Sequence, residues 1–158
     1  MSKLVGDRLP DDLYRRLAGN NLQACAEKAI LICSVDANGF AHPAVLSYFE
    51  VAAKDANNIR LATYKGSSTS NNMRRNGKLT MLIIDTRTAY YIKGSIAELE
   101  AEMRCSSQNS KFNLHVEQVL ADEANEEFEP GSYILSGVTY KRQTDLPKVR
   151  VMLQELLT

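Results

Sequence analysis

Residues 63–84 read TYKGSSTSNNMRRNGKLTMLII, and the interpretation of the rest of the chain starts from this stretch. Three hydroxyl residues at 67–69 precede a short polar segment that ends at Asn76-Gly77. Hydroxyl side chains are favoured at the start of a helix, and glycine is favoured just past its end. The pattern therefore predicts a helix of about two turns, with a strand over 59–64 before it and an apolar strand over 79–84 after it.

Further strands are predicted on both sides of this stretch. The apolar, β-branched run 29–35 is typical of a strand. Asp36-Ala37-Asn38-Gly39 follows it, and Asn and Gly tolerate the positive φ of tight turns, so a second strand is expected over about 41–51. On the C-terminal side, 89–99 predicts a strand in which Gly94 marks a bend or a bulge.

Helical spacing of apolar residues predicts flanking helices at 10–17, at 106–124 and after a cap at Thr144 or Asp145. One apolar stripe of the middle helix is formed by Phe112, Val116, Val119 and Leu120. Between the last two helices, 132–140 predicts the final strand. The result is a mainly β fold of six strands, and several short strands favour a small closed barrel because closure removes sheet edges.

The start of the predicted short helix is suited to a phosphate. Gly66 lets the backbone come close to a ligand, and the hydroxyl residues 67–69 stand where a helix has unpaired N–H groups and its positive dipole end. Lys65, Arg74 and Arg75 add positive charge nearby in the sequence. The alternative is that the hydroxyls only cap the helix. The sequence does not contain the Walker-type phosphate-binding loop.

The succession of strand, Asn38-Gly39 turn, two strands, the GSSTSNN segment and an apolar strand resembles the pyridoxamine 5′-phosphate oxidase-like, FMN-binding split-barrel superfamily. The resemblance covers residues 10–100 and is most specific over 63–84. It implies a six-stranded split β-barrel with flanking helices, FMN as cofactor, and a homodimer with the flavin at the subunit interface.

The resemblance also implies which residues contact FMN. The phosphate is expected at 67–69 with Asn72 nearby, the flavin tail along residues 62–63, and the isoalloxazine ring over the backbone of 43–45. His42 either binds the ligand or is a partly exposed strand histidine. The full set of expected cofactor-binding residues is His42, Pro43, Ala44, Val45, Ala62, Thr63, Lys65, Ser67, Ser68, Thr69 and Asn72.

Two departures from the superfamily pattern bear on function. Many members have an Arg-Lys pair where this chain has Ser68-Thr69, so the charge for the phosphate is expected from Lys65, Arg60 or Arg75. The chain contains no Trp, and its segment 137–143 does not match the Arg- and Trp-containing end of true pyridoxamine phosphate oxidases. Oxidation of pyridoxamine phosphate itself is therefore not expected.

Composition narrows the function classes. The chain of 158 residues is expected to form one domain over 1–158, and 19 basic against 19 acidic residues leave no net charge to attract nucleic acid. No apolar run approaches the roughly 20 residues that span a bilayer, and the N-terminus lacks a secretory signal, so a cytoplasmic protein is expected. Three distant cysteines indicate reduced thiols, and two histidines make no metal site.

The function that the sequence favours is that of an FMN-binding protein, namely a flavin-dependent oxidoreductase of unknown substrate. Hydride would reach the flavin from a reduced nicotinamide or from the substrate, and no side chain stands out as a catalytic acid or base. The alternatives are a barrel that binds flavin or haem without catalysis, and an empty dimeric scaffold.

Overall fold

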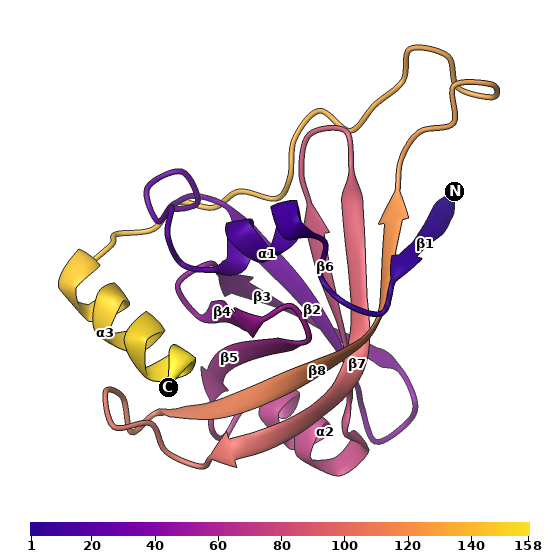
Figure 1. The fold of residues 1–158 in the computed structure, drawn as a ribbon. Coiled ribbons are helices and arrows are strands. Elements are labelled where there is room, and N and C mark those ends of the chain that lie inside the picture. The colour runs from indigo at the N-terminus through magenta and orange to yellow at the C-terminus, as the bar shows by residue number, and fades with distance from the viewer.

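One antiparallel sheet, curled into an open barrel, forms the body of the protein (Figure 1). The computed structural model describes residues 1–158, and its strands follow the order β3-β2-β6-β7-β8-β5-β4, with β1 paired to β8. The elements are β1 (Ser2–Gly6), α1 (Asp11–Leu17), β2 (Ala29–Val35), β3 (Ala41–Ser47), β4 (Val51–Asp55), β5 (Asn58–Tyr64), α2 (Ser68–Asn76), β6 (Lys78–Ile84), β7 (Ala89–Glu100), β8 (Asn109–Asp122) and α3 (Leu146–Leu157). The predicted mainly β fold with flanking helices is confirmed.

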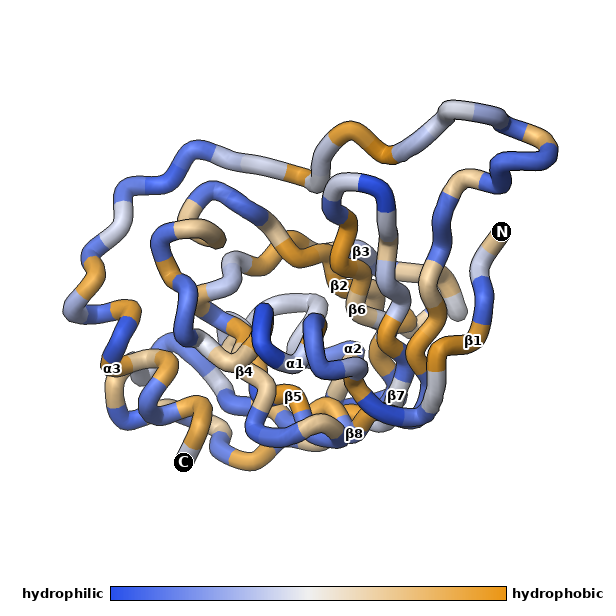
Figure 2. The backbone as a smooth tube through the Cα atoms, turned by 45° about the horizontal axis from the view of Figure 1, so that its top comes forward, coloured by the Kyte–Doolittle hydropathy of each residue, from blue (hydrophilic) through white to orange (hydrophobic).

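Side-chain alternation along the strands builds the barrel interior. In β2, Ile30 and Ile32 are buried, whereas Leu31 between them is partly exposed on the outer face. Met81 and Ile83 of β6 alternate in the same way. Helix α1 covers one mouth of the barrel through two fully buried leucines, Leu13 and Leu17, and Figure 2 shows it lying across that opening.

Helix α2 lies at the other end of the barrel, at the bottom of Figure 1. Ser67 is its N-cap, since the Ser67 side chain accepts a hydrogen bond from the N–H of Ser70. Gly77 ends it with a φ of 70°, a left-handed conformation that glycine adopts without strain. The predicted helix and both of its boundaries are confirmed, as are the flanking strands β5 and β6.

The predicted helix over 106–124 is wrong, because these residues form the long strand β8. Phe112 and Val116 are buried on one face of a strand with period two. A bulge then places Glu117 as an extra residue opposite the Lys93–Gly94 step, so that Val119 is the next buried position. The resulting spacings of four and three imitate a helical stripe.

The predicted strand over 132–140 is also wrong. This segment is irregular and mostly exposed, and its one ladder contact is an isolated bridge between Lys28 and Thr139. The expected sixth barrel strand is supplied instead by β8, while β1 and β4 are short additional strands. In Figure 2 the irregular chain between β8 and α3 alternates between hydrophilic and hydrophobic stretches. Its large apolar side chains Phe128, Leu135 and Tyr133 are exposed.

The closing helix α3 is confirmed, with Asp145 as its N-cap. It packs on the outer face of β4 and β5 and not inside the barrel. The cluster beneath it consists of Phe49, Ala52, Ala62, Met103, Val149, Leu153 and Leu156. No helix is both long enough and apolar enough to cross a bilayer.

Candidate functional site

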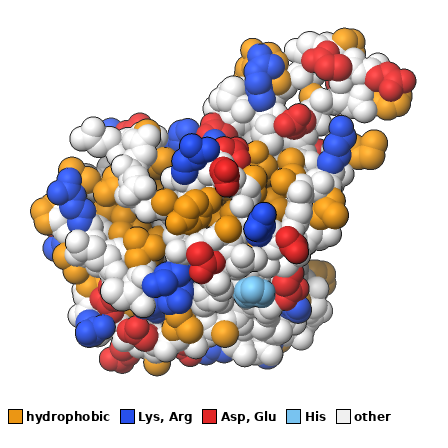
Figure 3. All heavy atoms as spheres, viewed as in Figure 1, with side chains coloured by type: hydrophobic (Ala, Val, Ile, Leu, Met, Phe, Trp, Pro, Cys, Tyr) orange, Lys and Arg blue, Asp and Glu red, His pale blue; other side chains and the backbone are white.

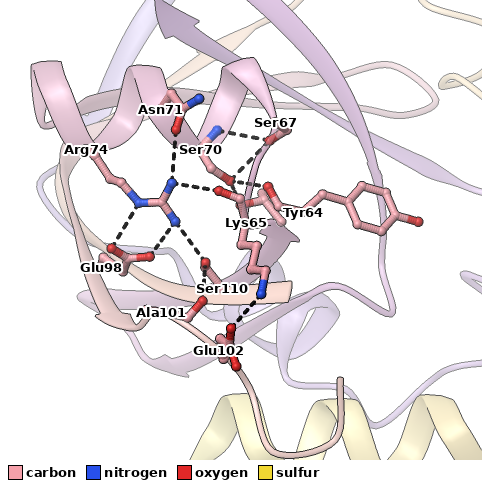
Figure 4. A network of polar contacts seen from close by, with 11 residues as sticks. Tyr64, Lys65, Ser67, Ser70, Asn71, Arg74, Glu98, Ala101, Glu102 and Ser110 are labelled. Carbon is pink, nitrogen blue, oxygen red and sulfur yellow. Dashed lines mark hydrogen bonds and ion pairs between the residues drawn. The ribbon is translucent and has the colours of Figure 1, made fainter. Parts of the chain in front are cut away.

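The start of α2 is held by a network of hydroxyl groups that Figure 4 shows in close-up. Ser70 lies at its centre, because its hydroxyl donates to the Tyr64 carbonyl at 2.7 Å and lies 2.6 Å from the Thr63 hydroxyl. The N–H of Ser70 donates to the Ser67 hydroxyl at 3.1 Å. Ser67 therefore caps the helix, as the alternative interpretation expects. Ser70 was missed, although it belongs to the continuous run of hydroxyl residues at 67–70 in the sequence.

Two backbone donors remain free at this helix start. The N–H groups of Ser68 and Thr69 belong to the first turn, where an α-helix supplies no internal acceptor. The Ser68 side chain is exposed, and the space beside Gly66 is open, since a Cβ placed there would meet nothing within 4 Å. An anion can therefore approach residues 66–69 from solvent and meet N–H donors at the positive end of the helix dipole.

The nearby cations are already paired. Arg74 donates to both carboxylate oxygens of Glu98, at 3.0 and 2.6 Å, and to the Ser110 hydroxyl and the Lys65 carbonyl (Figure 4). This pairing raises the pKa of Arg74 and lowers that of Glu98. The Lys65 ammonium is bound to Glu102. Both cations thus face protein carboxylates, Arg74 in a half-buried pair and Lys65 in an exposed one.

Two other arginines considered from the sequence lie farther from the helix start. Arg75 donates to the Val35 carbonyl and to Asn72, and seven residues of helix, about 10 Å, separate it from Ser68. Arg60 lies four residues before Tyr64, about 13 Å along an extended strand. The donors at the start of α2 are thus neutral groups supported by the helix dipole.

Buried Asn72 ties α2 to the strands on the other side of the barrel. Its amide donates to the Ser34 hydroxyl at 3.1 Å, and its carbonyl oxygen accepts from Arg75 at 2.8 Å. The Ser34 hydroxyl in turn lies 3.5 Å from the carbonyl oxygen of His42 in β3. Asn72 therefore has both ends of its side chain engaged within the protein, which is a positioning role for α2.

The four expected residues on β3 lie on two different faces. His42 and Ala44 pair with the inward positions Ser34 and Ile32 of β2. Pro43 and Val45 point to the outer face, where Val45 is 57% exposed. Because β3 is an edge strand, its outer face and its free edge are both accessible.

The two expected residues of β5 also diverge. Thr63 points inward and lies within hydrogen-bond distance of Ser70. Ala62 points outward but is 0% exposed, because α3 packs over it with Leu153 and Val149. A ligand that extends from Tyr64 along the outer face of β5 toward Ala62 would meet α3.

The outer face of β3, β2 and β6 is apolar and uncovered within the chain. Leu31 stands between Val45 on β3 and Leu82 on β6 in the ladder, and Cys33 pairs with Pro43. All of these side chains are partly or largely exposed. A second exposed apolar region is the segment after β8, in which Phe128 is 74% exposed. Figure 3 shows apolar and acidic side chains side by side on this projection at the upper right.

Sequence comparison gives little functional information. No known family profile matches the chain. One curated relative, the uncharacterized protein YclD of Bacillus subtilis, is 28% identical over 116 residues, which are 73% of this chain and 75% of YclD. YclD therefore shares most of the chain, but its description names no activity.

Solved structures define the fold. HupZ of group A Streptococcus superposes with a TM-score of 0.59 at 14% identity, over 73% of this chain and 95% of HupZ. A Lactobacillus delbrueckii protein that bears the provisional name pyridoxamine 5′-phosphate oxidase superposes with a TM-score of 0.57 at 18% identity, over 75% of this chain and 98% of that protein. These likenesses confirm the predicted split-barrel fold.

Proposed function

We propose, from the split-barrel fold that this chain shares with pyridoxamine 5′-phosphate oxidase-like proteins, that it binds FMN with the phosphate at the start of α2. The observation that carries the proposal is the pair of free N–H groups of Ser68 and Thr69 beside open space at Gly66. The residues present fit a phosphate through neutral donors. Because charge-assisted hydrogen bonds are roughly twice as strong as neutral ones, we expect weaker binding than a basic pair would give.

The bound flavin would supply hydride transfer, and the protein would supply orientation and a dry surface. Ser68 and Thr69 would hold the phosphate, and the outer positions Pro43 and Val45 of β3 would lie beneath the ring. On this proposal the protein is a flavin-dependent oxidoreductase of unknown substrate. The second candidate is a barrel that binds flavin or haem without catalysis, and it is favoured by the pairing of both cations near the start of α2 with protein carboxylates.

The same proposal includes a homodimer. Its support is the uncovered apolar face of β3, β2 and β6, on which Val45, Leu31 and Leu82 form a row across three strands. Large apolar sheet faces are normally covered, and a second copy of the chain would cover this one. Pro43 also belongs to this face, so a flavin lying over β3 would lie at the edge of the dimer.

The experiment is a titration of the purified protein with FMN, followed by flavin fluorescence and by absorbance. Ser68→Asp is the decisive variant, because an acidic residue in the first turn stabilises a helix while it repels a phosphate. We expect at least tenfold weaker FMN binding by this variant, with the fold retained. Ser132→Asp, at an exposed position outside the site, is the matched control and should bind like the unaltered protein.

Three results would separate the candidates. Saturable FMN binding followed by flavin-dependent oxidation of reduced nicotinamide supports the oxidoreductase. FMN binding without turnover, or a Soret band on addition of haem, supports the carrier. Absence of saturable FMN binding, or equal binding by the unaltered protein and Ser68→Asp, overturns the proposed phosphate site.

A further inference from the structure

A pocket of about 230 Å³ lies between the end of β5 and α3. Its apolar wall is formed by Phe49 of the β3–β4 turn and by Val149 and Met152 of α3. Its polar wall includes Asn109 and Arg142. Most of this wall comes from the C-terminal part of the chain, outside residues 10–100 that resemble the superfamily, so the resemblance assigns it no role.

Arg142 is held in place by hydrogen bonds from one of its three side-chain nitrogen atoms. Its Nη1 donates to the Ser47 hydroxyl at 2.6 Å and to the Tyr140 hydroxyl at 3.3 Å. Its guanidinium carbon lies 5.3 Å from the centroid of the Phe49 ring. The Nε and Nη2 atoms donate no hydrogen bond within the protein. A guanidinium held on one side and free on the other is a suitable partner for a carboxylate or phosphate.

The other charges around the pocket are engaged with protein groups. One carboxylate oxygen of Glu50 accepts from both the N–H and the hydroxyl of Ser47, each at 2.8 Å, and lies 4.0 Å from Arg142. Lys148 and Asp145 pair with each other at 3.6 Å on the exposed rim. Arg142 also forms an ion pair with Glu50 through Nη1, but its Nε and Nη2 atoms donate no hydrogen bond within the protein.

The pocket adjoins the proposed phosphate site. The Tyr64 side chain lines the pocket, and the Tyr64 carbonyl accepts the hydroxyl of Ser70 in the network that holds the start of α2. Only Lys65 and Gly66 separate Tyr64 from the cap residue Ser67. The pocket therefore lies on the side of the helix start where only the phosphate end of a bound FMN is proposed.

We propose that this pocket binds a small planar molecule through its carboxylate or phosphate group, with Arg142 as the anion partner. The volume is below the roughly 300 to 1,000 Å³ of sites that enclose a drug-sized ligand, so it suits a single ring with its anionic group. Phe49, Val149 and Met152 would contact the ring.

The test is a titration of the FMN-free protein with benzoate and, separately, with phenyl phosphate, followed by NMR shifts of backbone amides. We expect saturable shifts at residues of the pocket, with the tighter probe identifying the anionic group, and none with neutral benzyl alcohol. Arg142→Gln should weaken binding at least tenfold. Arg87→Gln is the matched control, because Arg87 also stacks on an aromatic ring, that of Tyr133, but lies outside the pocket.

Arg142→Lys guards against loss of fold, since it keeps the charge and loses the second donor edge. It should bind benzoate more weakly than the unaltered protein and more tightly than Arg142→Gln. Equal binding by all three proteins, or no saturable shift with either anion, overturns the anion site. The result is independent of FMN, so binding of benzoate by a protein that does not bind FMN would overturn the proposed function and leave the pocket assignment standing.

Discussion

The two ends of the sheet differ in whether a helix covers their outer face. The face of β4 and β5 is sealed by α3, which buries Ala62 and Ala52 completely. The face of β3, β2 and β6 is equally apolar but has no covering element, and Val45 on it is 57% exposed. Both faces belong to one continuous sheet, so the contrast lies in what the chain supplies to cover each.

The covered face also shows what secures such a contact. Lys111, nearly fully buried, donates to the carbonyl of Glu155 in α3 at 2.8 Å and pairs with Glu100. The Glu155 carboxylate accepts from the N–H groups of Arg104 and Cys105. These hydrogen bonds all meet at Glu155, so they hold the C-terminal part of α3 against the sheet beside the apolar cluster. The uncovered face has its apolar row without such ties inside the chain, which is the arrangement expected of a surface that meets a partner.

The largest change in stability is expected from a substitution that removes apolar packing between α3 and the sheet. Leu156→Ala removes a side chain that is 0% exposed beneath α3, and we expect the free energy of unfolding to fall by about 2 to 5 kcal/mol. Urea denaturation measures the change. Val151→Ala on the same helix is the control, since Val151 is 50% exposed and its truncation should cost about 0.5 kcal/mol or less. Equal losses in the two variants would contradict the packing of α3.

The next effect concerns the uncovered face. Val45→Asp places a charge in the middle of the apolar row and should raise the dissociation constant of the proposed dimer at least tenfold, equivalent to about 1.4 kcal/mol. Light scattering over a dilution series measures it. Val151→Asp is the matched control, because Val151 is similarly exposed but lies on α3. A protein that is monomeric before the change, or a dimer that survives it, would contradict the assignment of this face.

Local signals explain what the sequence predicted well. The caps of α2 at Ser67 and Gly77 and the turn at Asp36–Gly39 depend on residues within one turn, and each occurs as predicted. In the turn, Asp36 accepts from the N–H groups of Asn38 and Phe40, and Gly39 has a φ of 84°. Such short-range patterns predict caps and turns without knowledge of the fold.

Long-range pairing explains what the sequence did not predict. The bulge predicted at Gly94 is confirmed, but its partner, the extra residue Glu117 of β8, could not be predicted, because it depends on the pairing of β7 with β8. The pairing of Lys65 with Glu102 and the burial of Ala62 under α3 likewise join distant parts of the chain. The position of the candidate phosphate site was therefore predictable, whereas the state of its charges and neighbours was not.

A smaller change in stability tests whether the hydroxyls of Ser67 and Ser68 have different roles at the start of α2. Ser67→Ala removes the cap and should lower the free energy of unfolding by about 1 kcal/mol. Ser68→Ala removes a hydroxyl that is exposed and outside the cap network, so stability should hardly change. Thermal unfolding of the two variants side by side measures the difference. Equal losses would show that the hydroxyl of Ser67 is not the cap.

The smallest effect is a change in pH dependence on the covered face. Burial alone would raise the pKa of Glu155, but hydrogen bonds from the Cys105 thiol and from the N–H groups of Cys105 and Arg104 lower it overall. A carboxyl whose pKa is lowered by folding stabilises the protein above its unfolded pKa of about 4.3, and this contribution is lost as the pH falls through the folded pKa.

Glu155→Gln keeps an oxygen that can accept a backbone N–H, so only the part of the contribution that depends on charge should disappear. We expect the difference in free energy of unfolding between the unaltered protein and Glu155→Gln to be constant from pH 7 to about pH 5 and to shrink below about pH 4.3. Urea denaturation at each pH measures it, and the contributions of other carboxyls whose pKa is lowered, such as Asp85 and Glu98, cancel in the difference. A difference that stays constant down to pH 3 would mean that the Glu155 charge does not help to hold α3 on the sheet. In that case the sealed face would depend on apolar packing alone, and its contrast with the uncovered face would lie only in the presence of α3.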